Sequence, residues 1–490
     1  MSHDLYASWA TAELTRHLKT TPIDCFQGQV NATQLSMYAN RESGRVWPIP
    51  DGRISAEIQN AKFEIAVELK RTNEGVHGIL TAIGQSQAYL HKGYTGSIII
   101  IPERYDSHSA PGNYIRDVIN ATRTDLPIGV FSYQAPDTTN ASPFAGKLTC
   151  HKRIGMPLTK TVTTGNPLLV QKSNTQWAHL REGSSEAHAF FKYLQLAKQM
   201  GVTGLTEPSL DLPAGLIAAC NRLRGNHTIE KYLSNSVGDT FHDFIWRHFW
   251  FGNIITSNVA NIWSSRIPYV INNAATELLK PDGTGSKVFF SGKADSIKNK
   301  LIAQLNAGTI NENEAWDLFV TNIRNRAHSY REDIDSGLAH LGFIENDGKP
   351  SDVGYKFVDA CERTNDCHSG RPMLILGAAI LKNGSIGALL HYFYKLSEQA
   401  FSTNPLRFTQ RVTGKGLKFQ QLDYLNWIKE ELANNLKVMN TASLRGGSDR
   451  RPFQGEFAVL RKFNLVGSFR IGVGLEINWP LVQEYLEFEL

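Results

Sequence analysis

Residues Phe63 to Lys70 read Phe-Glu-Ile-Ala-Val-Glu-Leu-Lys, an alternation of apolar and polar side chains with two opposite charges near its end. Successive side chains of a β-strand point to opposite faces, so the apolar residues would share one face and could enter a core. Glu68 and Lys70 would share the other face, about 7 Å apart. A carboxylate can hold a hard divalent cation, and a neighbouring lysine can orient a water molecule or stabilise charge developing on a phosphate.

A cation in such a place needs a second carboxylate. Asp51 is the expected one, because it stands between Pro50 and Gly52 at the head of the preceding strand. Glu57, on that same strand, is an alternative, and Asp51-Gly52 could also be no more than a turn. We therefore expect Asp51 and Glu68 to be metal ligands, with Glu57 as the rival to Asp51.

Pro50-Asp51 followed by Glu68-Leu69-Lys70 resembles the motif of the PD-(D/E)XK nuclease superfamily. The resemblance, which covers roughly residues 28–135, implies that Asp51 and Glu68 hold Mg²⁺ and that Lys70 is the catalytic lysine. It implies a core with a central sheet flanked by helices in the order αβββαβ.

Three further residues have supporting roles by this resemblance. Gln85 and Tyr89 are similar to a Gln-xxx-Tyr element that lies beside the site in some branches of the superfamily. At i and i+4 of a helix their side chains share one face, although an exposed helix surface is the equal alternative. Glu42 would be the extra acidic residue that some members carry on their first helix.

The elements that must position these residues follow from periodicity and turn signals. The expected helices are residues 5–19, 28–40, 78–91 and 113–124, and the expected strands are residues 45–49, 53–58, 63–70, 96–102 and 127–133. The Ile-rich strand 96–102 is of the kind that is buried on both faces. This order predicts a mixed α/β sandwich and agrees with the family's core.

A chain of 490 residues is too long for one ordinary core. We expect a nuclease domain over residues 1–135, a linker with a small β element over 136–183 and a mainly helical domain over 184–322. A winged-helix-like element is expected over 323–365, and a C-terminal α+β region that could recognise DNA over 366–490.

The winged-helix prediction depends on a helix over residues 330–341, an apolar Phe343-Ile344, a polar turn and a helix opened by Ser351. Such a fold can place a helix in the major groove, although many winged helices bind proteins instead. The candidate DNA-binding side chains are Arg407, Arg411, Arg445, Arg450 and Arg451. Arginine can contact phosphate or read guanine, but a solvated charged surface is the alternative.

Composition bounds these ideas. A net charge of +5 permits nucleic-acid binding without arguing for it. No apolar run is long enough for a membrane span, and five scattered cysteines fit a reduced cytoplasmic setting. Asp282 to Lys287 lacks the first glycine of a phosphate loop, so we expect no nucleotide cofactor. The aromatic stretch 241–251 favours a buried helix over a base-stacking surface.

Together these observations predict a Mg²⁺-dependent endodeoxyribonuclease, and most specifically a prokaryotic type II restriction endonuclease. Its partner would be double-stranded DNA, which it would cut as a homodimer or a transient dimer on DNA. The alternatives are a modification-dependent or other anti-phage nuclease, a repair nuclease, and a winged-helix regulator with a degenerate nuclease fold.

Overall fold

The computed structural model describes residues 3–28, 30, 35–41, 47–58, 61–105, 108–155, 174–178, 180, 185–203, 240–249, 277–279, 286–288, 300, 303–311, 314, 333–403, 408, 417–440, 452–470 and 474–490. The chain divides into two compact units. The first comprises Met1–Asn166, Gln171–His179 and Gly377–Glu489. The second comprises Pro167–Val170 and Leu180–Leu376, together with Leu490. The predicted domain boundaries stay predictions.

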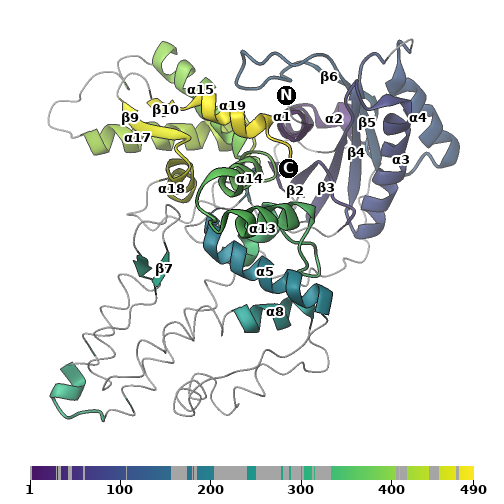
Figure 1. Ribbon diagram of the computed structural model, residues 1–490. Helices are drawn as coiled ribbons and strands as arrows, with labels where there is room; N and C mark the ends of the chain where they lie inside the picture. The colour runs from purple at the N-terminus through teal and green to yellow at the C-terminus, as the bar shows by residue number, and fades with distance from the viewer. Residues whose placement is uncertain are drawn as a thin grey trace. The chain divides into compact units, whose positions relative to one another are not determined.

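The first unit contains a six-stranded mixed sheet with its strands in sequence order, of which β2 to β6 are labelled in Figure 1. The strands are β1 (Leu35–Asn40), β2 (Gly52–Ile58), β3 (Ala61–Leu69), β4 (Gly96–Pro102), β5 (Ile128–Tyr133) and β6 (Leu148–Lys152). The three central strands β3, β4 and β5 run parallel, and the outer pairs are antiparallel. The predicted α/β class is therefore confirmed.

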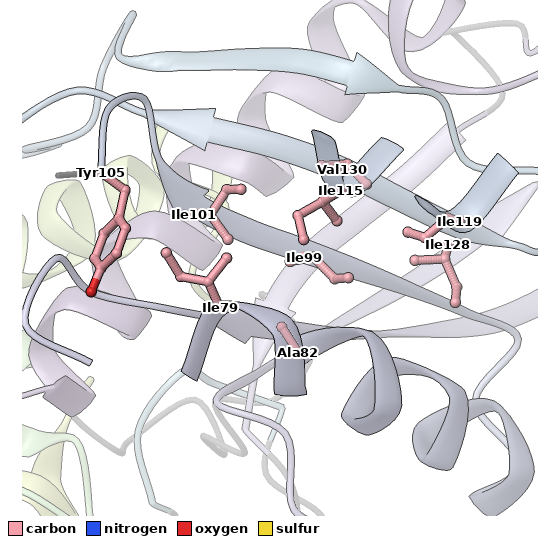
Figure 2. Packing of buried hydrophobic residues seen from close by; sticks show 9 residues of the cluster. All are labelled: Ile79, Ala82, Ile99, Ile101, Tyr105, Ile115, Ile119, Ile128 and Val130. Carbon is pink, nitrogen blue, oxygen red and sulfur yellow. The ribbon is translucent and has the colours of Figure 1, made fainter. Parts of the chain in front are cut away.

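The core beside this sheet is rich in isoleucine. Strand β4 is buried along its whole length, as expected for a parallel strand that is covered on both faces. Helices α3 (Gly75–Lys92) and α4 (Pro111–Thr122) pack over one face (Figure 2). The cluster contains Ile79, Ala82, Ile99, Ile101, Tyr105, Ile115, Ile119, Ile128 and Val130. Helix α3 is capped by Gly93, whose left-handed φ of 113° is accessible to glycine.

Helix α1 (His3–Thr20) packs against β1, β2 and β3 and is followed by the short α2 (Pro22–Cys25). Its contacts bury Trp9, Leu14 and Leu18. The helices α1, α3 and α4 thus lie close to their predicted positions, with ends that differ by one to three residues, as is usual for helix termini.

The first strand was placed wrongly by the sequence pattern. Residues 35–40, expected at the end of a helix over 28–40, form β1 and pair with β2 from Leu35 opposite Ile58 to Asn40 opposite Arg53. Residues 47–49, expected in a strand, are not in one, and residues 42–46 lie outside the described part. Pairing with β2 is a long-range contact that local periodicity does not report.

The sheet also extends further than expected. Residues 148–152, within the predicted linker and small β element, form β6 and pair with β5 as an edge strand. The strand belongs to the central sheet because Phe131, Ser132 and Tyr133 of β5 provide its partners.

The segment from Gly370 onward forms helices and two strands, and its residues from Gly377 to Glu489 belong to the first unit. Its elements are α14 (Gly370–Leu381), α15 (Ile386–Thr403), α17 (Leu417–Glu430), a π-helical turn η4 (Glu431–Asn435), α18 (Gln454–Lys462), β9 (Val466–Arg470), β10 (Gly474–Ile477) and α19 (Trp479–Glu487). Among the described residues no single helix is long and apolar enough to cross a membrane, and the bent pair α14–α15 passes that test only when its two helices are counted together.

The second unit contains α5 (Ala187–Thr203), α8 (Phe241–Phe249), α13 (Asp352–Thr364) and the short strands β7 (Glu277–Leu279) and β8 (Ser286–Val288). Phe244 and Phe249 of α8 are buried, which confirms the expected buried helix. Before α13, Ile344 bridges to Pro350, and Ser351 caps the helix by accepting a hydrogen bond from the Gly354 N–H at 3.1 Å. The winged-helix fold stays a prediction.

The isoleucine core should carry much of the sheet's stability. Ile99→Ala removes a fully buried side chain and should lower the free energy of unfolding by about 2–5 kcal/mol, measured by urea unfolding. Leu80→Ala on α3 is the matched control, because Leu80 is 38% exposed. An equal effect of the two substitutions would contradict the assigned core.

Candidate active site

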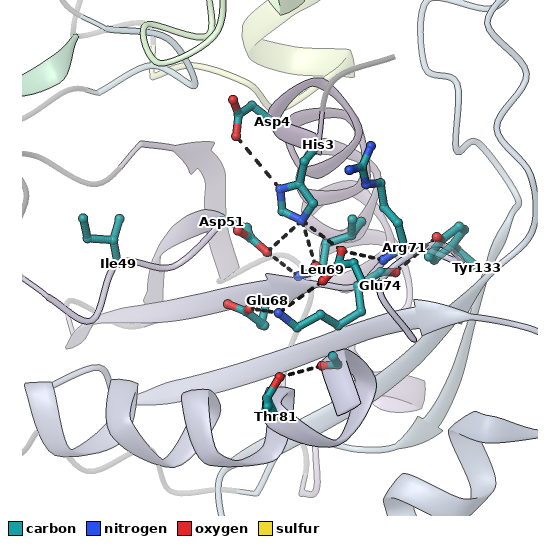
Figure 3. Close-up of polar contacts among 12 residues, drawn as sticks. His3, Asp4, Ile49, Asp51, Glu68, Leu69, Arg71, Glu74, Thr81 and Tyr133 are labelled. Atoms are coloured by element: carbon teal, nitrogen blue, oxygen red, sulfur yellow. Dashed lines mark hydrogen bonds and ion pairs between the residues drawn. The ribbon is translucent and has the colours of Figure 1, made fainter. Parts of the chain in front are cut away.

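The pairing of β2 with β3 brings the motif residues together. Gly52 lies opposite Val67, so Asp51, one residue before β2, is next to Glu68. Asp51 Oδ2 accepts a hydrogen bond from the Leu69 N–H at 2.8 Å (Figure 3). This bond fixes the carboxylate at the end of β3, so the structure brings Asp51 to Glu68 as the sequence predicted.

Glu68 and Lys70 form a nearly buried ion pair. Lys70 Nζ lies 2.7 Å from Glu68 Oε1, and the two residues are only 7% and 2% exposed. The opposite face of β3 carries the expected apolar side chains, and all four are buried: Phe63, Ile65, Val67 and Leu69. Strand alternation therefore separates core from site within a single strand.

The pair lies at the carboxyl edge of the parallel strands. Lys70 directly follows β3, and its N–H donates to the Ile100 carbonyl of β4 at 2.9 Å. The Tyr133 hydroxyl, at the end of β5, donates to the Lys70 carbonyl at 3.1 Å. Open α/β sheets commonly bind their ligands at this edge.

Tyr89 of α3 holds Glu68 from the other side. Its ring is fully buried next to Ala66 and Tyr94, and its hydroxyl donates to Glu68 Oε2. The same hydroxyl lies 3.2 Å from the Ile49 carbonyl. The sequence left open whether Tyr89 supports the site or lies on an exposed helix surface. The structure places it beside the site.

The remaining candidates are less closely tied to the cluster. Gln85 lies one turn before Tyr89, and its side-chain oxygen is buried without a hydrogen-bond partner among the described residues. Glu57 lies at the far end of β2 opposite Lys62, roughly 20 Å along the strand from Asp51. Glu42 and the five candidate arginines (Arg407, Arg411, Arg445, Arg450 and Arg451) lie outside the described residues.

Two residues of the cluster had no signal in the sequence. His3, at the start of α1, places Nε2 3.1 Å from the Leu69 carbonyl, 3.7 Å from Asp51 Oδ2 and 3.5 Å from Glu74 Oε1. Glu74 also places Oε2 3.6 Å from Lys70 Nζ. His3 reaches the site because α1 packs against β3, and no spacing along the chain reports that contact.

Burial and charge perturb these groups in opposite directions. Burial of the Asp51 carboxyl, reinforced by the charge of Glu68, raises its pKa to about 7, although His3 and the Leu69 N–H act against the rise. Burial alone would lower the pKa of His3, but Asp4, Asp51 and the Leu69 carbonyl outweigh it and raise the pKa to about 9. Burial likewise opposes protonation of Lys70, whose pKa the Glu68 carboxylate nevertheless raises.

The oxygen donors suit a small hard cation. Mg²⁺ is usually held by one or two carboxylates with water completing its shell, and Asp51 and Glu68 are two adjacent carboxylates. The charge of Glu68 raises the pKa of Asp51, a repulsion that a divalent cation between the two would relieve. Within the described residues, no three His, Cys, Asp or Glu side chains form a complete ligand group, so water would have to supply most of the coordination.

Comparison with known proteins gives no match, since neither a model of a protein family nor a curated protein matches the chain. Two carboxylates able to hold a cation, a protonated lysine and a protonated imidazole suit a reaction that develops negative charge on a phosphate.

The raised pKa of Asp51 predicts how the free energy of unfolding depends on pH. The pKa of this carboxyl is about 7 in the folded protein and 3.8 in the unfolded chain. Its contribution to the free energy of unfolding is therefore fully present below about pH 4 and is lost as the pH rises through 7. Asp51→Asn stays neutral, so in EDTA its free energy of unfolding should exceed that of the wild type at pH 8 by about 4 kcal/mol.

Urea unfolding at pH 5, 6, 7 and 8 measures this difference, which should grow up to pH 7 and then level. Glu57→Gln makes the same chemical change at the other end of β2 and is the matched control. The pH trend is not due to the site if both variants show it equally.

Proposed function

We propose that this protein is a Mg²⁺-dependent nuclease that hydrolyses phosphodiester bonds of DNA. The observation that carries the proposal is the convergence of Asp51, Glu68 and Lys70 at the carboxyl end of β3, with Lys70 Nζ 2.7 Å from Glu68. The order of helices and strands supports a PD-(D/E)XK-like core, since one helical segment and three strands precede α3, β4, α4 and β5.

In the proposed reaction Asp51 and Glu68 would hold Mg²⁺. The chemistry that Mg²⁺ supplies when bound is polarisation of a phosphate oxygen and activation of water. Tyr89 keeps Glu68 in place by donating to Oε2, so the second carboxylate oxygen stays aligned with Lys70. The residues around the carboxylates thus preorganise the site before substrate arrives.

Lys70 suits electrostatic stabilisation and the orientation of water. Its raised pKa keeps the ammonium group protonated at neutral pH, so it can donate hydrogen bonds to a phosphate oxygen or to the attacking water. A protonated lysine cannot accept the proton of that water. The proton would therefore pass to another group or to solvent.

We further propose duplex DNA as the substrate and a type II restriction endonuclease of the prokaryotic cytoplasm as the role. Cutting both strands at one place requires two active sites, which favours a homodimer or transient pairing on DNA. This finer proposal is supported by the predicted winged helix and the arginines of the C-terminal region. Phosphodiester hydrolysis at the site does not depend on it.

Removing either charged residue of the pair should abolish cutting. Lys70→Ala and Glu68→Ala should each lower the cleavage rate at least about 100-fold, because each removes a group that acts in the transition state. The assay incubates full-length protein and Mg²⁺ with unmethylated plasmid, methylated plasmid and single-stranded DNA. Lys62→Ala is the control, since Lys62 is an exposed lysine at the other end of β3.

Discrete fragments from unmethylated plasmid would support the type II role. Cutting of methylated plasmid alone would replace it with a modification-dependent nuclease. Failure of folded wild-type protein to cut any of the three substrates would overturn the proposed activity.

Tyr89→Phe tests the support of Glu68 separately. The ring stays buried while the hydrogen bond to Glu68 is lost, so the Mg²⁺ concentration for half-maximal cutting should rise about 10-fold to 100-fold. Titration of Mg²⁺ in the plasmid assay measures it. Tyr114→Phe on α4 is the control, because that tyrosine is 57% exposed. A Mg²⁺ requirement equal to that of the wild type would show that Tyr89 does not position Glu68.

A further inference from the structure

A cavity of about 600 Å³ lies next to the candidate active site. Its wall is built by the segments that follow three parallel strands: residues 71–73 after β3, 102–104 at the end of β4 and 133–136 at the end of β5. Tyr6 of α1 completes it. The volume is within the range of about 300–1,000 Å³ that is usual for small-molecule sites.

The cavity and the catalytic lysine share parts of their framework. Arg71, which lines the cavity, directly follows Lys70, and its N–H donates to Glu74 Oε1 at 2.9 Å. Tyr133, which also lines it, donates to the Lys70 carbonyl (Figure 3). A ligand in the cavity would therefore lie beside the group proposed to stabilise the phosphate.

The chemistry of the wall matches the parts of a nucleotide. Arg71 and Arg104 offer planar guanidinium groups that suit phosphate. Asn73 and Gln134 carry amides that can donate to and accept from the edge of a base. Gln134 Nε2 donates a hydrogen bond to Glu103 Oε1 at 3.4 Å. With two arginines and the one carboxylate of Glu103, the residues that line the cavity carry one net positive charge.

The aromatic part of the wall is held rigidly. Tyr6 and Tyr133 each meet the buried ring of Phe144 edge to face, with centroids 5.7 Å and 5.5 Å apart. Rings fixed in this way provide a surface for a base at little cost in conformational entropy. Stacking of bases on aromatic side chains is a usual component of binding to unpaired nucleotides.

We propose that this cavity binds one nucleotide of the cleaved strand next to the scissile phosphate. Its phosphate would contact Arg71 and Arg104, and its base would lie against Tyr6 and Tyr133. This inference rests on the proposed nuclease function, because it makes the cavity part of the same substrate site. A base in the cavity must leave the helical stack, which is least costly at a mismatch, a modified base or a strand end.

Binding in EDTA tests the cavity without any cutting. A fluorescent oligonucleotide with one unpaired base is titrated with full-length protein, and its anisotropy is measured. Arg104→Gln should weaken binding about tenfold, because it removes a charge-assisted contact to phosphate. Tyr6→Leu should also weaken it, with circular dichroism checking the fold. Arg123→Gln is the matched control, because Arg123 lies beyond α4 and before the amino end of β5.

Competition identifies the ligand. Deoxynucleoside 5′-monophosphates should displace the oligonucleotide at concentrations at least about tenfold lower than inorganic phosphate does, since only they carry a base. Equal potency of phosphate would overturn the nucleotide assignment.

The two proposals fail separately. Wild-type protein that cuts DNA while Arg104→Gln and Tyr6→Leu bind as tightly as the wild type would overturn the cavity proposal alone. Binding that depends on Arg104 and Tyr6, without cutting in Mg²⁺, would uphold nucleotide binding in the cavity and overturn the proposed nuclease activity.

Discussion

The site depends on keeping two carboxylates, Asp51 and Glu68, close together and largely out of water. Burial and mutual repulsion both oppose this, and they raise the pKa of Asp51 to about 7. The surrounding contacts offset that cost: the Leu69 N–H bonds Asp51, and Lys70 pairs with Glu68. A site that must be compensated in this way is suited to a cation, because a divalent ion would remove the repulsion that the protein itself only reduces.

Strand β3 serves the core and the site at the same time. Its apolar face is buried, while its other face meets α3 through Ala66 and Tyr89. The same helix contributes Ile79 and Ala82 to the isoleucine cluster, so the ring that bonds Glu68 stands on a close-packed element. Geometry that must hold to fractions of an ångström is better provided by such elements than by loops.

Patterns of neighbouring residues correctly predicted the features that depend on neighbouring residues alone. Alternation along β3 placed Glu68 beside Lys70, and four consecutive isoleucines marked β4 as a buried strand. The failures involve distant contacts. Residues 35–40 became a strand by pairing with β2, and His3 reaches the Leu69 carbonyl across 66 positions of the chain. Neither contact produces a periodic pattern in the sequence, because both depend on how distant elements pack against one another.

Charge links the cluster to the cavity beside it. Four carboxylates (Asp4, Asp51, Glu68 and Glu74) lie within 4.0 Å of one lysine or one imidazolium, which leaves two net negative charges when all are ionised. That charge would attract Mg²⁺ but would repel the phosphates of DNA, so the proposed nuclease also needs positive charge beside its acidic centre. Arg71 and Arg104 place that charge at the same edge of the sheet. The cation and the polyanion can then occupy neighbouring places, because Arg71 directly follows Lys70 and Arg104 follows β4, the strand paired with β3.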